Sequence, residues 1–237
     1  MSNNKTPFKP MTLIIIIVVI FVAALVVSIL IQLFNSPDFS GFKKAPAPTP
    51  VVTFIPGGDA STADTSTPVY NWQDHPVFIV GDSLTQGAKN EINKVVANAT
   101  IDAQQSRGMG AGLQVIQNWD ATGKLPDDAI IVVCLANNIT DTTVQDAQKI
   151  VDMIKPGQSL IMMTGHGLSN MADANAFIRS LPNLYPYVTL ADWDLTIAQS
   201  PSLLGADGIH ISKSQGNTLY ADLIVRALEV TQPRPQS

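Results

Sequence analysis

The sequence has few residues of the kinds that form disulfides, bind metals or stack on nucleic acid bases. Its 237 residues include one cysteine and three histidines, and aromatic residues make up 6% of the chain. The single cysteine, Cys134, excludes an internal disulfide, and the histidines lack the spacing of metal ligands, so we expect neither a metal nor another cofactor. The net charge of -5 leaves no basic surface for phosphates, which argues against a nucleic acid partner.

One apolar run, by contrast, is unusually long. Residues 11–34 are almost entirely Ile, Val, Leu, Ala and Phe, interrupted by Thr12, Ser28 and Gln32. The run exceeds the roughly 20 residues that cross a bilayer, so it predicts a single transmembrane helix. A cleaved signal peptide has an apolar core of only about 7–15 residues and a small-x-small site after it, and no such site follows here. No cysteine follows the run either, which argues against a lipoprotein.

The lysines around this run are almost evenly divided, because two precede it and two follow it closely. The short N-terminal tail, residues 1–10, favours the cytoplasm, which places the rest of the chain on the outer side of the membrane. Residues 35–73 come next and are rich in proline, alanine, threonine and serine. Such a segment cannot bury a core, so we expect an extended or disordered linker.

The remainder, residues 74–231 with a tail at 232–237, is enough for one compact domain. Predicted strands alternate along it with predicted helices. The strands lie near Val77, Thr100, Ile130, Leu160 and Val188, and the helices around Ile92, Ile116, Ile150, Phe177 and Leu223. Such alternation indicates a parallel sheet covered by helices on both faces. We therefore expect a three-layer α/β/α fold.

The first candidate for chemistry is Ser83, in the stretch Gly-Asp-Ser at residues 81–83. The apolar run before this stretch predicts a buried strand, and the apolar spacing after it predicts a helix. Ser83 therefore lies at a strand-to-helix turn, where free N–H groups of the helix start lie beside its hydroxyl and can hold an oxyanion. We expect the Asp82 carboxylate to stabilise the turn through hydrogen bonds.

The second candidate is the pair Asp207 and His210, which stand three residues apart in a glycine-containing turn before the last predicted helix. This spacing lets the carboxylate reach one imidazole nitrogen while the other nitrogen faces a hydroxyl, as the activation of a serine requires. Each pattern alone is found about as readily in an ordinary turn as in a functional site. The two patterns together, at opposite ends of an alternating α/β domain, favour catalysis.

These residues resemble the SGNH, or GDSL, family of serine esterases and acyltransferases, and the resemblance covers residues 76–228. It implies that Ser83 is the nucleophile, His210 the base and Asp207 the acid that orients the base. It also implies an oxyanion hole, to which Ser83 supplies one backbone N–H.

Two further blocks of the family complete that hole, and both differ here from the family pattern. Residues 101–108 are similar to a stretch of SGNH domains that acetylate wall glycans, with Ser106 in place of a glycine that points its N–H into the hole. Gly108 is the alternative. The amide donor of the family is matched by Asn138, with Asn137 as the alternative, although two asparagines after a strand are also ordinary turn residues.

Two more polar residues belong to the same edge of the predicted sheet. His166 follows the strand at residues 159–163, so it faces the crevice where open α/β sheets bind ligands. It either lines an acceptor site or has no role, and a loop histidine without a role is the favoured interpretation. Arg107 either orients a carboxylate or sugar substituent or closes a surface ion pair, and the ion pair is the favoured interpretation.

Location and chemistry together predict a membrane-anchored, extracytoplasmic enzyme that moves an acetyl group to or from envelope carbohydrate through an acyl-serine. An O-acetyltransferase is slightly preferred, and it requires a multispanning partner because one helix cannot carry acetyl groups across a membrane. A carbohydrate acetylesterase or a lipase-type GDSL esterase is the alternative. A catalytically silent glycan-binding domain is disfavoured by the presence of Ser83, Asp207 and His210. A glycan on the sequon at Asn138 would block the site, which favours a bacterial envelope.

Overall fold

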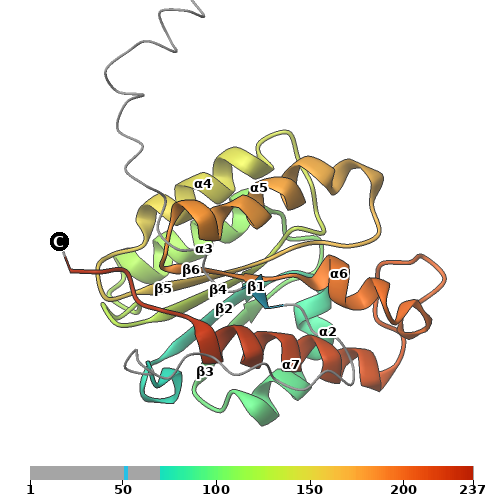
Figure 1. Ribbon diagram of the computed structural model, residues 1–237, viewed down its shortest axis with the longest axis horizontal. Helices are drawn as coiled ribbons and strands as arrows, with labels where there is room; N and C mark the ends of the chain where they lie inside the picture. Colours follow the sequence, from blue (N-terminus) through green and yellow to red (C-terminus); the bar gives the residue numbers. More distant parts are fainter. Residues whose placement is uncertain (1–50, 53–69, 237) are drawn as a thin grey trace, which may run out of the picture. The chain divides into compact units, whose positions relative to one another are not determined.

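The computed structural model describes residues 51–52 and 70–236. Its strands form one parallel sheet in the order β1-β6-β5-β4-β2-β3 (Figure 1). The strands are β1 (Val51–Val52), β2 (Val77–Gly81), β3 (Ala99–Ala103), β4 (Ile130–Cys134), β5 (Ser159–Met163) and β6 (Val188–Ala191). The α-helices are α2 (Ser83–Val95), α3 (Met109–Ala121), α4 (Thr143–Met153), α5 (Ala172–Leu184), α6 (Trp193–Ala198) and α7 (Ser214–Val230). Short 3-10 helices are η2 (Trp72–Asp74), η3 (Ser169–Met171) and η4 (Pro201–Leu203).

The helices form a layer on each face of the sheet. Figure 1 shows α3, α4 and α5 on one side and α2 and α7 on the other. Side chains alternate along β2, so that Phe78 and Val80 join the core on the α3 side, whereas Val77 and Ile79 join the core on the α2 side. All residues of β2, β4 and β5 are buried, as expected for strands covered on both faces. The prediction of a three-layer α/β/α domain with a parallel sheet is confirmed.

The carboxyl ends of the strands meet at one edge of the sheet. The strand register pairs Gly81, the last residue of β2, with Ala103 of β3 and with Cys134 of β4. The loops that follow these three strands therefore lie side by side. This is the edge at which open α/β sheets bind ligands.

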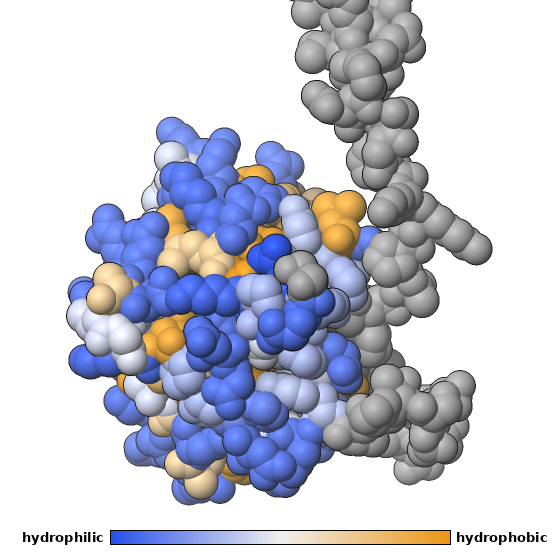
Figure 2. Space-filling model, turned by 90° about the vertical axis from the view of Figure 1, so that its left-hand side faces the viewer, coloured by the Kyte–Doolittle hydropathy of each residue, from blue (hydrophilic) through white to orange (hydrophobic). Residues whose placement is uncertain are grey.

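The outer surface is mostly polar where it is described. On the face in Figure 2, hydrophilic residues predominate and apolar residues form small separate patches. The large apolar side chains that are exposed are Val95, Leu168, Leu184 and Leu195. The apolar content of the domain is thus concentrated in the two cores beside the sheet.

The predicted linker, residues 35–73, takes part in the fold at two places. Val51–Val52 forms β1, which pairs in parallel with β6. Near its other end, Tyr70 and Trp72 pack against the core on the α2 side, and the Tyr70 ring stacks on His75 at 4.3 Å. The composition of residues 35–73 predicts an extended or disordered linker, and at these two places the described residues add a strand to the sheet and side chains to the core. A strand of two residues needs only backbone hydrogen bonds, so composition gives no sign of it.

The predicted transmembrane helix, residues 11–34, lies outside the described residues. Among the helices that are described, none is long and apolar enough to cross a membrane. The described part of the chain also contains no cluster of His, Cys, Asp or Glu that could hold a metal ion.

Candidate active site

The turn between β2 and α2 presents Ser83 as the first residue of the helix. Asp82 caps this helix, since its Oδ1 accepts a hydrogen bond of 2.9 Å from the N–H of Leu84, as expected from the sequence. Gly81 is required by close packing, because a Cβ at this position would lie 2.1 Å from Oγ1 of Thr85. Asp82 is buried, and this burial raises the pKa of its carboxyl to about 6.

Ser83, His210 and Asp207 form a hydrogen-bonded chain. Ser83 Oγ lies 3.0 Å from Nε2 of His210, and Nδ1 of the same ring lies 2.7 Å from Oδ2 of Asp207. The other carboxylate oxygen of Asp207 accepts hydrogen bonds from the N–H groups of Ile209 and His210, at 2.9 and 3.0 Å. The pKa of the Asp207 carboxyl is lowered to about 2, most strongly by the bond from the N–H of Ile209 and next by the bonds from the side chain and the N–H of His210. Gly208 has φ 67, so the turn that joins acid and base needs a glycine.

The charge state of Asp207 fixes the proton on the imidazole. An ionised carboxylate only accepts hydrogen bonds, so Nδ1 of His210 must carry a hydrogen when it faces Asp207. In the neutral ring Nε2 then has a free lone pair, and it points at the Ser83 hydroxyl. The arrangement can take a proton from Ser83 Oγ.

The structure separates the two asparagines that follow β4. The side-chain amide of Asn138 donates a hydrogen bond of 3.3 Å to Oδ2 of Asp82, next to Ser83. Asn137 is buried and turned toward another loop, where its Oδ1 accepts a hydrogen bond of 3.0 Å from the N–H of His166. An ionised carboxylate can only accept hydrogen bonds, so the atom of the Asn138 amide that faces Asp82 must be its nitrogen. The second N–H of this nitrogen stays available.

The loop after β3 is fastened to the same turn. The N–H of Gln104 donates to the carbonyl oxygen of Gly81 at 3.1 Å. Ser106 has φ 59, which makes it the one non-glycine residue with positive φ in the described part of the chain. Glycine is favoured in this backbone conformation, which agrees with the glycine that the family resemblance places here. Gly108 instead caps the start of α3 with extended backbone angles.

Arg107 holds this loop from within and is not a surface residue. Its side chain is 7% exposed and pairs with Asp102 at 2.7 Å. Its Nη1 donates to the carbonyl oxygens of Asp102 at 2.6 Å and of Gly81 at 3.4 Å. The favoured interpretation of a surface ion pair was therefore wrong about the surface. The pair ties the ends of β2 and β3 together beneath the loop of Ser106.

A small cavity of about 70 Å³ lies beside the Ser83 hydroxyl. Its lining residues come from the start of α2, from the turn around the base and from α7, and they are Ser83, Leu84, Gly87, His210, Ile211 and Asn217. No atom lies within 4 Å of a Cβ built on Gly87. The space beside the nucleophile is therefore narrow, and it is open at Gly87.

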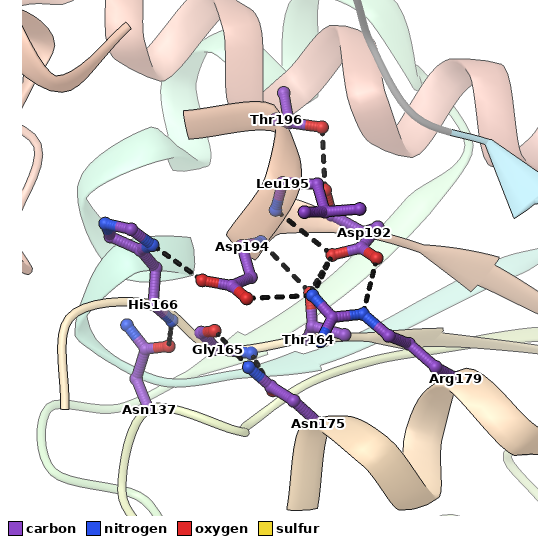
Figure 3. A network of polar contacts seen from close by, with 10 residues as sticks. All are labelled: Asn137, Thr164, Gly165, His166, Asn175, Arg179, Asp192, Asp194, Leu195 and Thr196. Carbon is purple, nitrogen blue, oxygen red and sulfur yellow. Dashed lines mark hydrogen bonds and ion pairs between the residues drawn. The ribbon is translucent and has the colours of Figure 1, made fainter. Parts of the chain in front are cut away.

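A second polar network lies along the same edge of the sheet, after β5 and β6 (Figure 3). His166 Nδ1 lies 2.7 Å from Oδ1 of Asp194, and Arg179 on α5 bridges the carboxylates of Asp192 and Asp194. Its hydrogen bonds with Asp192 raise the pKa of the Arg179 guanidinium further. Sequence reasoning singled out His166 but missed Asp194, which contacts it, and the ion pairs of Arg179 with Asp192 and Asp194. Their signal was the pair of aspartates directly after the predicted strand near Val188.

The solved structures to which this chain is similar include the catalytic domain of an O-acetyltransferase and a lipolytic protein of the G-D-S-L family. The C-terminal catalytic domain of peptidoglycan O-acetyltransferase A from Streptococcus pneumoniae, solved with a methylsulfonyl adduct, is 24% identical, covers 68% of this chain and 98% of that one, and has a TM-score of 0.61. A lipolytic protein of the G-D-S-L family from Veillonella parvula is 16% identical over 64% of this chain and 97% of that one, with a TM-score of 0.50. The resemblance to the SGNH/GDSL family is thereby confirmed for the fold.

Among curated proteins, the chain is similar to YrhL of Bacillus subtilis, which is provisionally named a peptidoglycan O-acetyltransferase. The two are 23% identical over 153 residues, which is 65% of this chain and 24% of that protein. The chain thus spans about a quarter of the length of this relative. No protein-family model matches the chain.

Proposed function

We propose that this chain, which has the fold of the SGNH/GDSL proteins, is a serine acyl-transfer enzyme that moves an acetyl group to or from an envelope glycan. The observation that carries the proposal is the hydrogen-bonded chain from Ser83 through His210 to Asp207. Of the two directions, transfer to a glycan hydroxyl is preferred, and peptidoglycan is the proposed glycan because both relatives with assigned substrates are named for it.

In the first half of the reaction, Ser83 Oγ attacks the carbonyl carbon of the acyl donor while His210 Nε2 takes the hydroxyl proton. A bond forms from Oγ to carbon, and the carbonyl oxygen becomes negative. The N–H groups of Ser83 and Ser106 and the amide of Asn138 are the proposed donors to this oxygen. When the intermediate collapses, the donor oxygen leaves with the proton from His210, and the acyl group stays on Ser83.

In the second half, an acceptor hydroxyl gives its proton to His210 and attacks the acyl-serine. The ester bond to Ser83 Oγ breaks, and the serine recovers its proton from His210. A sugar hydroxyl as acceptor completes O-acetylation, and water as acceptor completes ester hydrolysis. Both outcomes share one intermediate, so the difference lies in which acceptor is bound and oriented.

The cavity beside Ser83 supports acetyl as the acyl group. A space of about 70 Å³ has little room for more than a few heavy atoms, and long acyl chains would have to leave it through the opening at Gly87. A lipase-type substrate is therefore less suited to the site than an acetyl ester.

We also propose that residues 11–34 anchor the enzyme in the membrane with the domain on the outer side. In this arrangement the acetyl group needs a multispanning partner that delivers it from the cytoplasm, since one helix has no path for it. A carbohydrate acetylesterase needs no such partner. Loss of the partner's gene should therefore abolish the transferase activity and leave an esterase activity in place.

The test of the proposed function is the turnover of a small acetyl ester by the full chain in detergent. Ser83→Ala and His210→Ala should each remove nearly all turnover, because nucleophile and base act as a unit. Ser202→Ala, an exposed serine on η4, is the matched control and should keep wild-type activity. Wild-type turnover by Ser83→Ala would end the proposal. Adding a glycan oligomer and comparing acetylated sugar with free acetate then separates transfer from hydrolysis.

A further inference from the structure

A second cavity, of about 440 Å³, lies next to the network of Figure 3. It is bounded by the loop after β5, by η3, by α5 and by the start of α6, with His166, Leu168, Asn175, Arg179 and Asp194 among its lining residues. Its volume falls within the range of about 300–1,000 Å³ that small-molecule sites occupy. The proposed acyl-transfer chemistry does not use it.

The backbone connects this cavity to the proposed catalytic residues. A Cβ on Gly167 would lie 2.5 Å from the carbonyl oxygen of Gly208, so the loop of His166 packs directly on the turn between Asp207 and His210. On its other side, the N–H of His166 is held by Asn137, the neighbour of Asn138. His166 therefore lies between the loop that carries His210 and the loop that carries Asn138.

The polar groups of the cavity are fixed in place before any ligand arrives. Asp192 is 1% exposed and accepts bonds from Thr164 Oγ1 at 2.9 Å and from Arg179 Nε at 2.7 Å. Arg179 also donates to Asp194 at 2.8 Å, and Asp194 in turn contacts His166. Because a buried carboxylate anchors the network, the side chains on its outer rim lose little further freedom on binding.

The charges in this network do not favour an anionic ligand. Arg179 is the one cation among the residues that line the cavity, and its guanidinium is already paired with the carboxylates of Asp192 and Asp194. Like charges disfavour a phosphate or carboxylate here. The available groups instead suit hydroxyls, which can both donate to Asp194 and accept from an arginine or an asparagine.

Two further details favour a sugar over other neutral ligands. His166 Nδ1 faces a carboxylate and so carries the hydrogen, which leaves Nε2 as an acceptor with no partner among the described residues, and in Figure 3 it points away from the network. Leu168, 36% exposed, adds an apolar surface to the lining, on which the flat face of a sugar ring can pack.

We propose that this cavity is the subsite for one uncharged sugar of the acceptor glycan, and that His166, held by Asp194, accepts a hydrogen bond from a hydroxyl of that sugar. The inference rests on the proposed acyl-transfer function and deepens it, because it states how the acceptor is positioned. His166 is a positioning residue in this scheme and takes no part in bond breaking.

The test uses the full chain in detergent with a β-1,4-linked N-acetylhexosamine oligomer as acceptor and a small acetyl ester as donor. Ala172→Phe fills the cavity from the exposed start of α5, and Ala176→Phe, exposed on the same helix outside the lining, is the matched control. Ala172→Phe should raise the acceptor KM about tenfold or more. His166→Ala should raise it about 3- to 10-fold, as expected for one lost hydrogen bond. Hydrolysis of the ester without acceptor should stay at the wild-type rate in Ala176→Phe, and it is measured in all three variants so that a change in acceptor KM is separated from a change in the chemical step.

An unchanged acceptor KM in both Ala172→Phe and His166→Ala would overturn the inference. An equal effect in Ala176→Phe would overturn it too, because the change would then come from the helix and not from the cavity. Failure of the proposed function has a different signature, namely no ester turnover by the wild-type chain. Isothermal titration calorimetry of the oligomer with the Ser83→Ala chain measures binding at the subsite without turnover. If the double variant Ser83→Ala/Ala172→Phe binds the oligomer with the same affinity as Ser83→Ala, the result counts against the proposed subsite.

Discussion

The contact between Asp207 and His210 makes Asp207→Asn the most informative single substitution in the proposed active site. The carboxylate has two separate tasks, because Oδ1 accepts two backbone N–H groups and Oδ2 faces Nδ1 of the imidazole. Asparagine keeps an oxygen for the first task and places an NH2 donor against Nδ1. The ring must then carry its hydrogen on Nε2, where it points at Ser83 Oγ and cannot accept the serine proton.

The size of the effect follows from the exposure of the pair. In a buried serine-protease triad the same exchange lowers kcat by about 10⁴. Here the side chains of His210 and Asp207 are 52% and 49% exposed, so water can solvate Nδ1 and restore part of the active tautomer. We therefore expect kcat for a small acetyl ester to fall by about 10²–10³, with a change of less than about threefold in KM, because the pair does not touch the acyl donor before reaction.

The assay is the initial rate of ester hydrolysis at pH 7 to 9, with Asp173→Asn, exposed on α5, as control. Wild-type Asp207 keeps its charge down to a pKa of about 2, so any loss of wild-type activity between pH 7 and 4 must come from another group. A decrease of less than tenfold in Asp207→Asn would refute the assignment of Asp207 as the group that fixes the tautomer. So would a large decrease that is matched by Asp173→Asn.

Three other predictions concern stability, specificity and topology. Burial raises the pKa of Asp82 to about 6, so the folded chain binds this proton more tightly than the unfolded chain does, and the group adds on the order of 2–3 kcal/mol to the free energy of unfolding as pH falls from 6 toward 4. Asp82→Asn should remove this gain in urea unfolding, and an unchanged pH profile would contradict it. Gly87→Ala should stabilise α2 by about 0.5–1 kcal/mol and lower turnover of butyryl esters more than of acetyl esters, whereas equal losses would argue against an acyl cavity. Protease added outside intact cells should cut within the proline- and threonine-rich segment at residues 35–73 and release the domain, and cleavage only after lysis would indicate the opposite orientation.

Much of the fold could be predicted because its signals are local. The runs that became β2, β4 and β5 are apolar throughout, and buried parallel strands require this. β1 has only two residues and pairs through its backbone, so no pattern in the sequence announces it. The prediction of the strands missed β1, because this strand depends on pairing with β6, far along the chain, and not on a pattern of its own side chains.

The site divides in the same way. Ser83, Asp207 and His210 stand in turns whose residues are characteristic, and the structure brings them within hydrogen-bond distance. Arg107 was expected in a surface ion pair, but its guanidinium reaches back under its own loop to Gly81, a contact that no local pattern in the sequence indicates. His166 contacts Asp194 of α6, and Arg179 of α5 contacts the same carboxylate. Only the folded chain places these three residues together.

The buried carboxylate beneath the nucleophile illustrates how a site can oppose stability. An ionised Asp82 is costly at neutral pH, as its raised pKa shows, yet an amide in its place could cap α2 through Leu84 equally well. What the amide cannot do is hold Asn138 in one orientation, because an amide offers both a donor and an acceptor. The carboxylate accepts only, so it draws the nitrogen of Asn138 toward itself and keeps the second N–H of that amide available beside Ser83. Fixing that donor before reaction is the condition under which it stabilises a developing oxyanion, so the charge that weakens the fold supports the proposed chemistry.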